Sequence, residues 1–264
     1  MYNEELQLAQ TLAIQAGDIL TTYFGTGLAV EAKAWADPVT AADKESEALI
    51  RSALLERFPN DAIDGEEEGR RPGSSGRLWL IDPLDGTANF AGGLPLFAVC
   101  ITLVLESAPD QALLNVTWDP IRREMFHAVR GEGAFLDGRA LAVSRRADLA
   151  GALVHVSFSS LRSIWPATIE LVRRLTEVAP HARDLGSSAL AQAYVAAGRL
   201  DAHTKVLSGM YDVVGGNLLI SEAGGSISNL DGDAWHERGS LIAAAPRLHP
   251  LLVEVLRGLP RATR

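Results

Sequence analysis

Two aspartates, Asp82 and Asp85, lie within the segment Leu78–Phe90, which reads Leu-Trp-Leu-Ile-Asp-Pro-Leu-Asp-Gly-Thr-Ala-Asn-Phe. The apolar residues 78–81 are long enough for the end of a buried strand and too short for a helix. Pro83 fixes its own φ and biases Asp82 toward an extended backbone, so both carboxylates should leave the end of one strand together. Two anions this close repel each other, and oxygen ligands favour a hard cation between them, such as Mg²⁺.

Gly86 and Thr87 follow the aspartates directly. The missing side chain of Gly86 lets a ligand approach the backbone, and Thr87 supplies a hydroxyl. If a helix begins here, its free N–H groups face an anion, and phosphate is the common one. The alternative interpretation is an Asp-Pro turn with Thr87 as a capping residue, which needs no ligand.

Other acidic residues fall at the starts and ends of predicted elements. Asp43 lies in the first turn of a helix that should begin at Thr40, and Asp212 lies at the start of another helix. By itself, each could serve only to balance a helix dipole or to cap its helix. Glu66 follows a short strand and should lie on a strand end beside Asp82, although a run of glutamates is usually solvated surface. Together these side chains would line one acidic cleft.

Two hydroxyls follow Gly186 at a further predicted helix start. Ser187 and Ser188 suit either a polar ligand or a capping role. The single cysteine, Cys100, lies in an apolar run, so we expect a buried thiol and no disulfide within the chain. The six histidines match no metal-ligand spacing and are assigned no role.

The composition describes an ordinary globular chain of 264 residues, 47% hydrophobic and 22% charged. Its net charge of −9 argues against binding to a nucleic-acid backbone, which calls for a basic stripe. The sequence shows no signal peptide and no apolar stretch of about 20 residues, so we expect a cytoplasmic protein without membrane contact.

The elements that must hold these groups divide near residue 150. Residues 1–150 should form an α+β half with an antiparallel sheet and most of the acidic residues, and residues 151–264 an α/β half that supplies Asp212 and the loops facing the substrate. Helices are predicted over 3–24, 40–58, 164–178, 186–197, 212–224 and 247–256. Strands are predicted over 61–65, 78–81, 97–105, 112–118, 124–129, 152–157, 182–185, 201–206 and 240–244. Residues 70–77 are predicted to form a loop and 108–110 a turn.

Several of these segments together resemble the inositol monophosphatase family. They are Gly-Glu-Glu at 65–67, Asp-Pro-Leu-Asp-Gly-Thr-Ala-Asn-Phe at 82–90, Tyr-Asp at 211–212 followed by Gly-Gly, and Glu-Ala-Gly-Gly at 222–225. The likeness covers nearly the whole chain. It implies a layered αβαβα sandwich of the inositol monophosphatase and fructose-1,6-bisphosphatase type, usually a homodimer, and a Mg²⁺-dependent, lithium-sensitive phosphomonoesterase.

The resemblance also implies roles for individual residues. The metal ligands would be Glu66, Asp82, the Leu84 carbonyl, Asp85 and Asp212. The catalytic set would be Asp43, Thr87 and Glu66, with Asp43 and Thr87 orienting the attacking water. The Gly86 and Thr87 amides would hold phosphate. From the residues themselves, we also expect Gly186, Ser187, Ser188, Lys205 and Asp212 to contact the substrate.

Lys205 departs from the family pattern. Many inositol phosphatases carry at this position, seven residues before Asp212, a glutamate that contacts ring hydroxyls. The Lys205 ammonium could pair with a second anionic group of the substrate, or it could turn into solvent. Tyr211 stands where tryptophan is usual, which is a conservative change in packing.

We therefore expect hydrolysis of a small phosphomonoester, similar to an inositol monophosphate, by metal-activated water. The alternatives are a fructose-1,6-bisphosphatase, a histidinol-phosphatase or another sugar or polyol phosphatase on this scaffold, or a regulatory binding protein. The partner would be a small phosphorylated metabolite, and no nucleic acid is expected. Asp85→Asn should lower turnover by orders of magnitude while the fold survives, because losing one carboxylate relieves repulsion in the metal-free protein.

Overall fold

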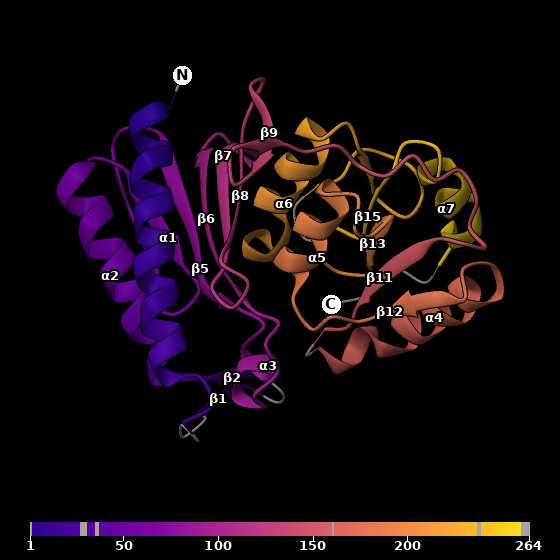
Figure 1. Ribbon diagram of the computed structural model, residues 1–264, viewed down its shortest axis with the longest axis horizontal. Helices are drawn as coiled ribbons and strands as arrows, with labels where there is room; N and C mark the ends of the chain where they lie inside the picture. The colour runs from indigo at the N-terminus through magenta and orange to yellow at the C-terminus, as the bar shows by residue number, and fades with distance from the viewer. Residues whose placement is uncertain (1, 27–30, 35–36, 160, 237–238, 260–264) are drawn as a thin grey trace.

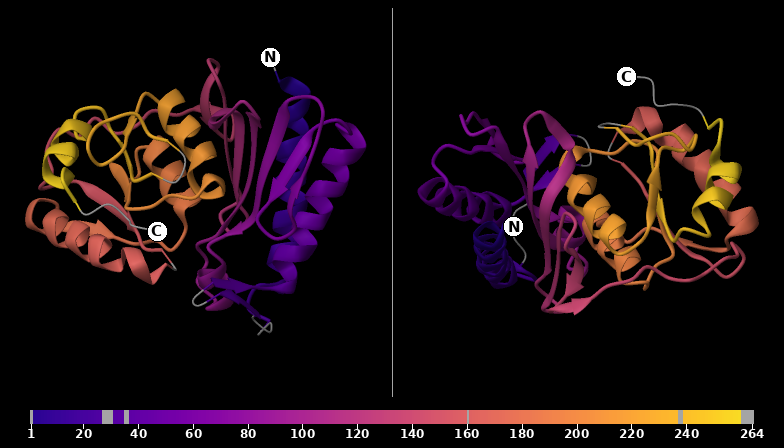
Figure 2. Two further views of the ribbon diagram at one scale, coloured as in Figure 1. Left: turned by 180° about the vertical axis from the view of Figure 1, so that it is seen from behind. Right: turned by 90° about the horizontal axis from the view of Figure 1, so that it is seen from above.

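Five layers of helix and sheet lie side by side in the computed structural model, which describes residues 2–26, 31–34, 37–159, 161–236 and 239–259 (Figures 1 and 2). The side chains of residues 31–34, 37–39 and 212 lie outside this description. The outer layer holds α1 (Asn3–Tyr23) and α2 (Ala41–Arg57), the central layer α5 (Ser188–Ala196) and α6 (Met210–Glu222), and the far layer α4 (Trp165–Val178) and α7 (His249–Leu256). One sheet fills each space between them, so the predicted αβαβα arrangement is confirmed.

The first sheet has eight strands in the order β10-β9-β8-β7-β6-β5-β3-β4. Their bounds are Ala62–Gly65 (β3), Gly69–Arg71 (β4), Arg77–Asp85 (β5), Ala98–Leu105 (β6), Ala108–Asp119 (β7), Glu124–Val129 (β8), Gly133–Leu136 (β9) and Arg139–Ala140 (β10). Every pair is antiparallel except β3 and β5. Two predictions are wrong here. Part of the loop expected at 70–77 pairs as β4, and residues 108–110 belong to β7, because pairing with a neighbouring strand overrides turn-forming residue types.

The second sheet has five strands in the order β12-β11-β13-β15-β14. Their bounds are Leu153–Ser157 (β11), His181–Arg183 (β12), Ala202–Lys205 (β13), Ser226–Ser228 (β14) and Leu241–Ala244 (β15). β11 is parallel to β12 and β13, and the other pairs are antiparallel. β14 and the hairpin of β1 (Glu31–Ala34) and β2 (Asp37–Val39) were not predicted, since such short strands leave little periodicity to read.

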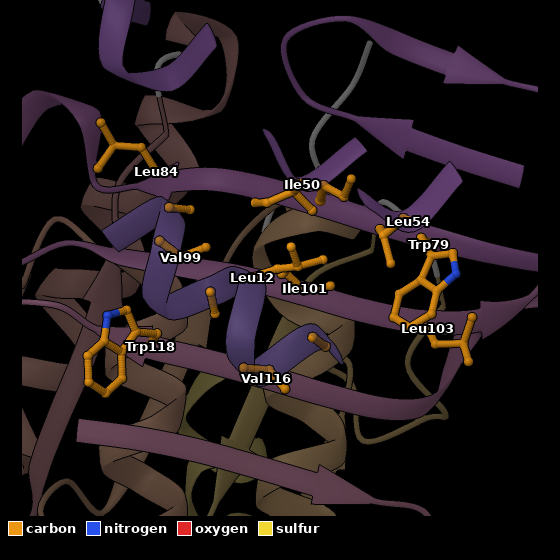
Figure 3. Packing of buried hydrophobic residues seen from close by; sticks show 14 of the residues in the cluster. Leu12, Ile50, Leu54, Trp79, Leu84, Val99, Ile101, Leu103, Val116 and Trp118 are labelled. Carbon is orange, nitrogen blue, oxygen red and sulfur yellow. The ribbon is translucent and has the colours of Figure 1, made fainter. Parts of the chain in front are cut away.

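The hydrophobic core that packs against the first sheet holds the carboxyl end of β5 in place. Figure 3 shows Leu12 of α1 and Ile50 of α2 packed against Ile101 of the sheet, and Leu84 belongs to the same buried cluster. The close approach of α1 requires glycine at position 17, because a Cβ there would lie 2.5 Å from the Trp118 Nε1. The end of β5 is therefore anchored by its own side chains in a rigid core. None of the helices in the described ranges is long and apolar enough to cross a membrane.

Candidate active site

The carboxyl end of β5 holds two aspartates inside the protein. Asp82 and Asp85 are 3% and 9% exposed, and between them Leu84 packs its side chain into the core. Asp82 Oδ1 accepts a hydrogen bond from the Leu84 amide at 3.0 Å. The pairing of β5 with β6 shifts between Asp82 and Asp85, where Pro83 has no amide hydrogen to donate. Both carboxylates thus leave one strand end, as the sequence predicted.

Asp85 also contacts the second half of the chain. Its Oδ2 accepts hydrogen bonds from the Ser187 hydroxyl and, at 2.9 Å, from the Ala189 amide, while its Oδ1 accepts one from the Ser188 amide at 3.3 Å. These donors form the start of α5, where free N–H groups favour a carboxylate. Ser187 itself caps α5 by accepting a hydrogen bond from the Leu190 amide at 3.2 Å. The two serines therefore have a structural role, and Asp85 joins the two halves across 102 positions of sequence.

Thr87 begins the short helix α3 (Thr87–Ala91) and lies between Asp43 and Leu84. Its hydroxyl oxygen is 3.0 Å from the Leu84 carbonyl and 3.4 Å from Asp43 Oδ1. Asp43 Oδ2 accepts hydrogen bonds from the Thr40 amide at 2.8 Å and the Thr40 hydroxyl at 2.5 Å, and the two residues form a capping box at the predicted start of α2. Because Asp43 is buried, the pKa of its carboxyl is raised above the usual value, although the Thr40 hydrogen bonds lower it in part.

Gly86 takes a backbone conformation that favours glycine. Its φ is +97°, and a Cβ would lie 2.8 Å from the Leu96 carbonyl oxygen. The two residues whose amides were assigned to phosphate, Gly86 and Thr87, are half-buried at the start of α3. Phosphate contact at these amides stays a prediction.

Glu66 leaves the end of β3 beside Asp82. Its amide donates to the Ile81 carbonyl at 3.1 Å, and the parallel pairing of β3 with β5 brings the two strand ends together as predicted. The Glu66 side chain is exposed, in contrast to the buried aspartates. A carboxylate at this edge can reach outward to a ligand or to solvent.

Glu47 holds the turn that follows Glu66, and the sequence reasoning missed it. The fully buried Glu47 carboxylate accepts hydrogen bonds from the amides of Glu67 at 2.8 Å and Glu68 at 2.9 Å. Burial raises the pKa of Glu47. The sequence feature that could have identified Glu47 is its position four residues after Asp43, because residues four apart share one face of a helix. One face of α2 thus contacts both Thr87 and the turn after Glu66.

A close contact between α3 and the segment before α5 explains the glycine at position 186. Asn89 Nδ2 donates to the Leu185 carbonyl at 2.7 Å and to the Leu96 carbonyl at 2.8 Å. A Cβ on Gly186 would lie 2.6 Å from Asn89 Oδ1, so a larger residue would separate these segments. Gly186 therefore has a packing role, and its contact with substrate stays a prediction.

Lys205 ends β13 and is buried, at 6% exposure. Its Nζ donates to the Ser188 hydroxyl oxygen at 3.1 Å, and the hydroxyl oxygens of Ser188 and Ser157 are 3.3 Å apart. The alternative that Lys205 turns into solvent is therefore wrong. The Lys205 ammonium donates to the Ser188 hydroxyl, and the Ser188 amide donates to Asp85. Lys205 therefore belongs to the same group of contacts as the strand-end carboxylates.

Two buried histidines lie behind Lys205 and Ser157 on the same pair of strands. The Nδ1 atoms of His155 and His203 are 2.9 Å apart, and the rings are stacked. Burial lowers the pKa of both, and the nearby Lys205 charge lowers both further. Asp184, whose Oδ1 lies 3.2 Å from the His155 Nε2, raises the pKa of His155 in part. The stacked rings join the paired strands β11 and β13.

The donor set at the strand ends fits Mg²⁺. It consists of oxygen atoms only, and two of its carboxylates are buried, where an uncompensated charge is costly. Among the side chains that the structure describes, no three acidic, histidine or cysteine residues form a metal-binding group. The expected set also includes the Leu84 carbonyl and Asp212. Asp212 lies in the first turn of α6, and its side chain is outside the described residues. Its role and those of Glu66, Asp82, Leu84 and Asp85 as metal ligands stay predictions.

Known proteins resemble this chain over almost its entire length. The sequence profile of the inositol monophosphatase family matches residues 1–261. The Nus factor SuhB of Pasteurella multocida is 36% identical over 251 residues, 93% of each chain, and that of Escherichia coli K12 is 36% identical over 257 residues, 96% of this chain and 95% of the other.

Solved structures agree with this assignment. The extragenic suppressor protein suhB from Bartonella henselae superposes with a TM-score of 0.91 at 30% identity, over 97% of this chain and 99% of the other. An IMPase from Thermotoga maritima superposes with a TM-score of 0.88 at 30% identity, over 97% and 98% of the two chains. The chain therefore belongs to the inositol monophosphatase family.

Proposed function

We propose that the protein hydrolyses a small phosphomonoester and that it needs Mg²⁺ to do so. The observation that carries this proposal is the position of Thr87, whose hydroxyl lies within reach of buried Asp43 at one strand–helix junction with Asp82 and Asp85. Family membership supports the same reaction class. The chemistry that Mg²⁺ supplies when bound is charge neutralisation at phosphate oxygens and a lowered pKa for water.

The residues of this chain have separate tasks in the proposed reaction. The Thr87 hydroxyl donates a hydrogen bond to Asp43. The lone pairs of the Thr87 oxygen can then accept a hydrogen bond from the attacking water. The amides of Gly86 and Thr87 bind phosphate oxygens at the start of α3. The water oxygen bonds to phosphorus as the bond to the alcohol oxygen breaks. One water proton ends on the departing alcohol oxygen and the other stays with the phosphate, so the products are the alcohol and inorganic phosphate.

Lys205 favours a substrate with a second negative group. Its buried ammonium donates to the Ser188 hydroxyl, and the Ser188 amide donates to Asp85, which directly precedes Gly86 and Thr87 of the proposed phosphate site. A sugar bisphosphate therefore competes with inositol monophosphate as the preferred substrate, and histidinol phosphate and other polyol phosphates remain alternatives. Lithium sensitivity, a homodimer and a cytoplasmic location also belong to this proposal, on the strength of family membership.

A second candidate is a regulatory role without turnover. The relatives from Pasteurella multocida and Escherichia coli carry the name Nus factor. That name favours a protein or nucleic-acid partner, against the expectation from net charge alone.

Phosphate release by the purified chain tests the first function. The substrates are inositol 1-phosphate, fructose 1,6-bisphosphate and histidinol phosphate, each with Mg²⁺ and with a chelator. We expect release that depends on Mg²⁺ and that Asp82→Asn reduces by orders of magnitude. No release from any of a broad panel of phosphomonoesters would contradict hydrolysis and leave the regulatory role.

A further inference from the structure

A tyrosine and an aspartate join the two halves of the protein close to the expected metal ligands. The Tyr211 hydroxyl donates to Asp64 Oδ1 at 2.9 Å, a contact between residues 147 positions apart. Tyr211 lies in the first turn of α6, directly before Asp212. Asp64 lies in β3, two residues before Glu66. One hydrogen bond thus connects the helix start that carries Asp212 with the strand end that carries Glu66.

Both sides of this contact are held by other hydrogen bonds. On the β3 side, Glu47 accepts hydrogen bonds from the two amides that follow Glu66. On the α6 side, Gly209 has no side chain to cap the helix, but the buried Ser208 before it donates its amide and its hydroxyl to the Gly239 carbonyl. The Tyr211–Asp64 hydrogen bond therefore joins two positioned segments.

We infer that the Tyr211–Asp64 hydrogen bond is a positioning contact that sets the separation of Glu66 and Asp212 and so determines how tightly the site binds a divalent cation. This inference rests on the proposed Mg²⁺ site. Neither residue touches the reacting atoms. The contact gives Tyr211 a role beyond packing, because its phenol hydroxyl reaches Asp64 in the other half of the chain.

A second tyrosine provides a matched control. Tyr194, in α5, has its hydroxyl oxygen 3.5 Å from Asp119 Oδ2 of β7, so it too joins the central helices to the first sheet. Tyr194 lies near the C-terminal end of α5, away from the end that contacts Asp85. Tyr194→Phe therefore removes a similar contact between the same layers without approaching the proposed metal site.

The test measures Mg²⁺ binding to the substrate-free protein by calorimetry. We expect Tyr211→Phe and Asp64→Ala each to raise the Kd for Mg²⁺ about tenfold, which is the upper range for loss of one hydrogen bond. Asp64→Asn retains a carbonyl oxygen as acceptor and should stay within about twofold of wild type by the same reasoning. Tyr194→Phe should leave the Kd unchanged, and the double variant Tyr211→Phe/Asp64→Ala should bind no more weakly than either single variant.

Each outcome separates the inference from the proposed function. If wild type does not bind Mg²⁺, the proposed function fails. If wild type, Tyr211→Phe and Asp64→Ala all bind Mg²⁺ equally well, the inference is overturned. A fall in the Tm of Tyr211→Phe similar to that of Tyr194→Phe would then show that the contact is purely structural. Should Tyr211→Phe not fold, the comparison of Asp64→Ala with Asp64→Asn decides alone. Activity gives a further readout, because the Mg²⁺ concentration for half-maximal rate should rise in Tyr211→Phe while kcat at saturating Mg²⁺ changes little.

Discussion

The Thr87 hydroxyl oxygen lies 3.4 Å from Asp43 Oδ1 and 3.0 Å from the Leu84 carbonyl, so one side chain joins the start of α2 to the end of β5. If this hydroxyl orients the attacking water, Thr87→Ala should lower kcat by about 10²-fold or more and change KM little. Thr87→Ser keeps a hydroxyl and should retain most of the rate. Steady-state kinetics of the three proteins test this, and a rise in KM alone would mean that Thr87 only binds phosphate.

Asp43 should make the stability of the metal-free protein depend on pH. Burial raises its pKa in the folded state, so the folded protein retains this proton to a higher pH than the unfolded chain does. The stabilisation is complete below the ordinary aspartate pKa and is lost as pH rises through the folded value. In the presence of a chelator, the Tm of Asp43→Asn minus that of wild type should therefore increase from about pH 4 toward neutral pH. A Tm difference that stays constant over this pH range would show that ionisation of Asp43 does not destabilise the folded protein.

Asp85→Asn should lower both turnover and stability. From the sequence alone we expected the fold to survive because repulsion is relieved, but the structure shows three donors at the start of α5 on this carboxylate. An amide has one acceptor oxygen, so at least one donor loses its bond. Weakening such a cap costs roughly 0.5–2 kcal/mol, or a few degrees in Tm for a chain of this size. Thermal melting without metal measures this, and a Tm equal to or above wild type would restore the repulsion argument.

Lys205→Glu should change substrate preference. The Lys205 ammonium is buried and bonded to Ser188, so the glutamate would place a negative charge where an anionic substrate group would bind. The loss for a bisphosphate should be roughly 1–3 kcal/mol, the range for hydrogen bonds to charged groups. The measurement is the ratio of kcat/KM for fructose 1,6-bisphosphate to that for inositol 1-phosphate. Lys205→Met serves as the control for packing, and an unchanged ratio in both variants would place Lys205 outside the substrate site.

Glu47→Gln should disturb the turn that carries Glu66. The carboxylate accepts hydrogen bonds from two amides with its two oxygens, whereas a glutamine would direct its NH₂ group at one of them. One unsatisfied buried donor costs about 1–3 kcal/mol, so Tm should fall by several degrees. Gly65→Ala probes the same contact from the other side, because its Cβ would meet the Glu47 side chain. Unchanged melting of both variants would show that this turn does not depend on Glu47.

Local backbone chemistry allowed part of this site to be predicted from the sequence. Pro83 and the apolar residues before it placed Asp82 and Asp85 at a strand end, and the spacing of Thr40 and Asp43 predicted the start of α2. These features depend on residues within a few positions of each other, so residue type and spacing carry the information. The order of the layers followed from family resemblance, which the comparisons confirm.

Only the tertiary structure decided what each carboxylate and cation contacts. Asp85 meets the start of α5 across 102 positions, and Tyr211 meets Asp64 across 147. Lys205 is turned inward because Ser188 lies beside its strand, which no feature of its own segment indicates. Such contacts form when separate layers pack together, and periodicity along one segment does not record which distant segment will cover it. The proposed chemistry therefore depends on local motifs for its groups and on the packing of α5 and α6 against the first sheet for their arrangement.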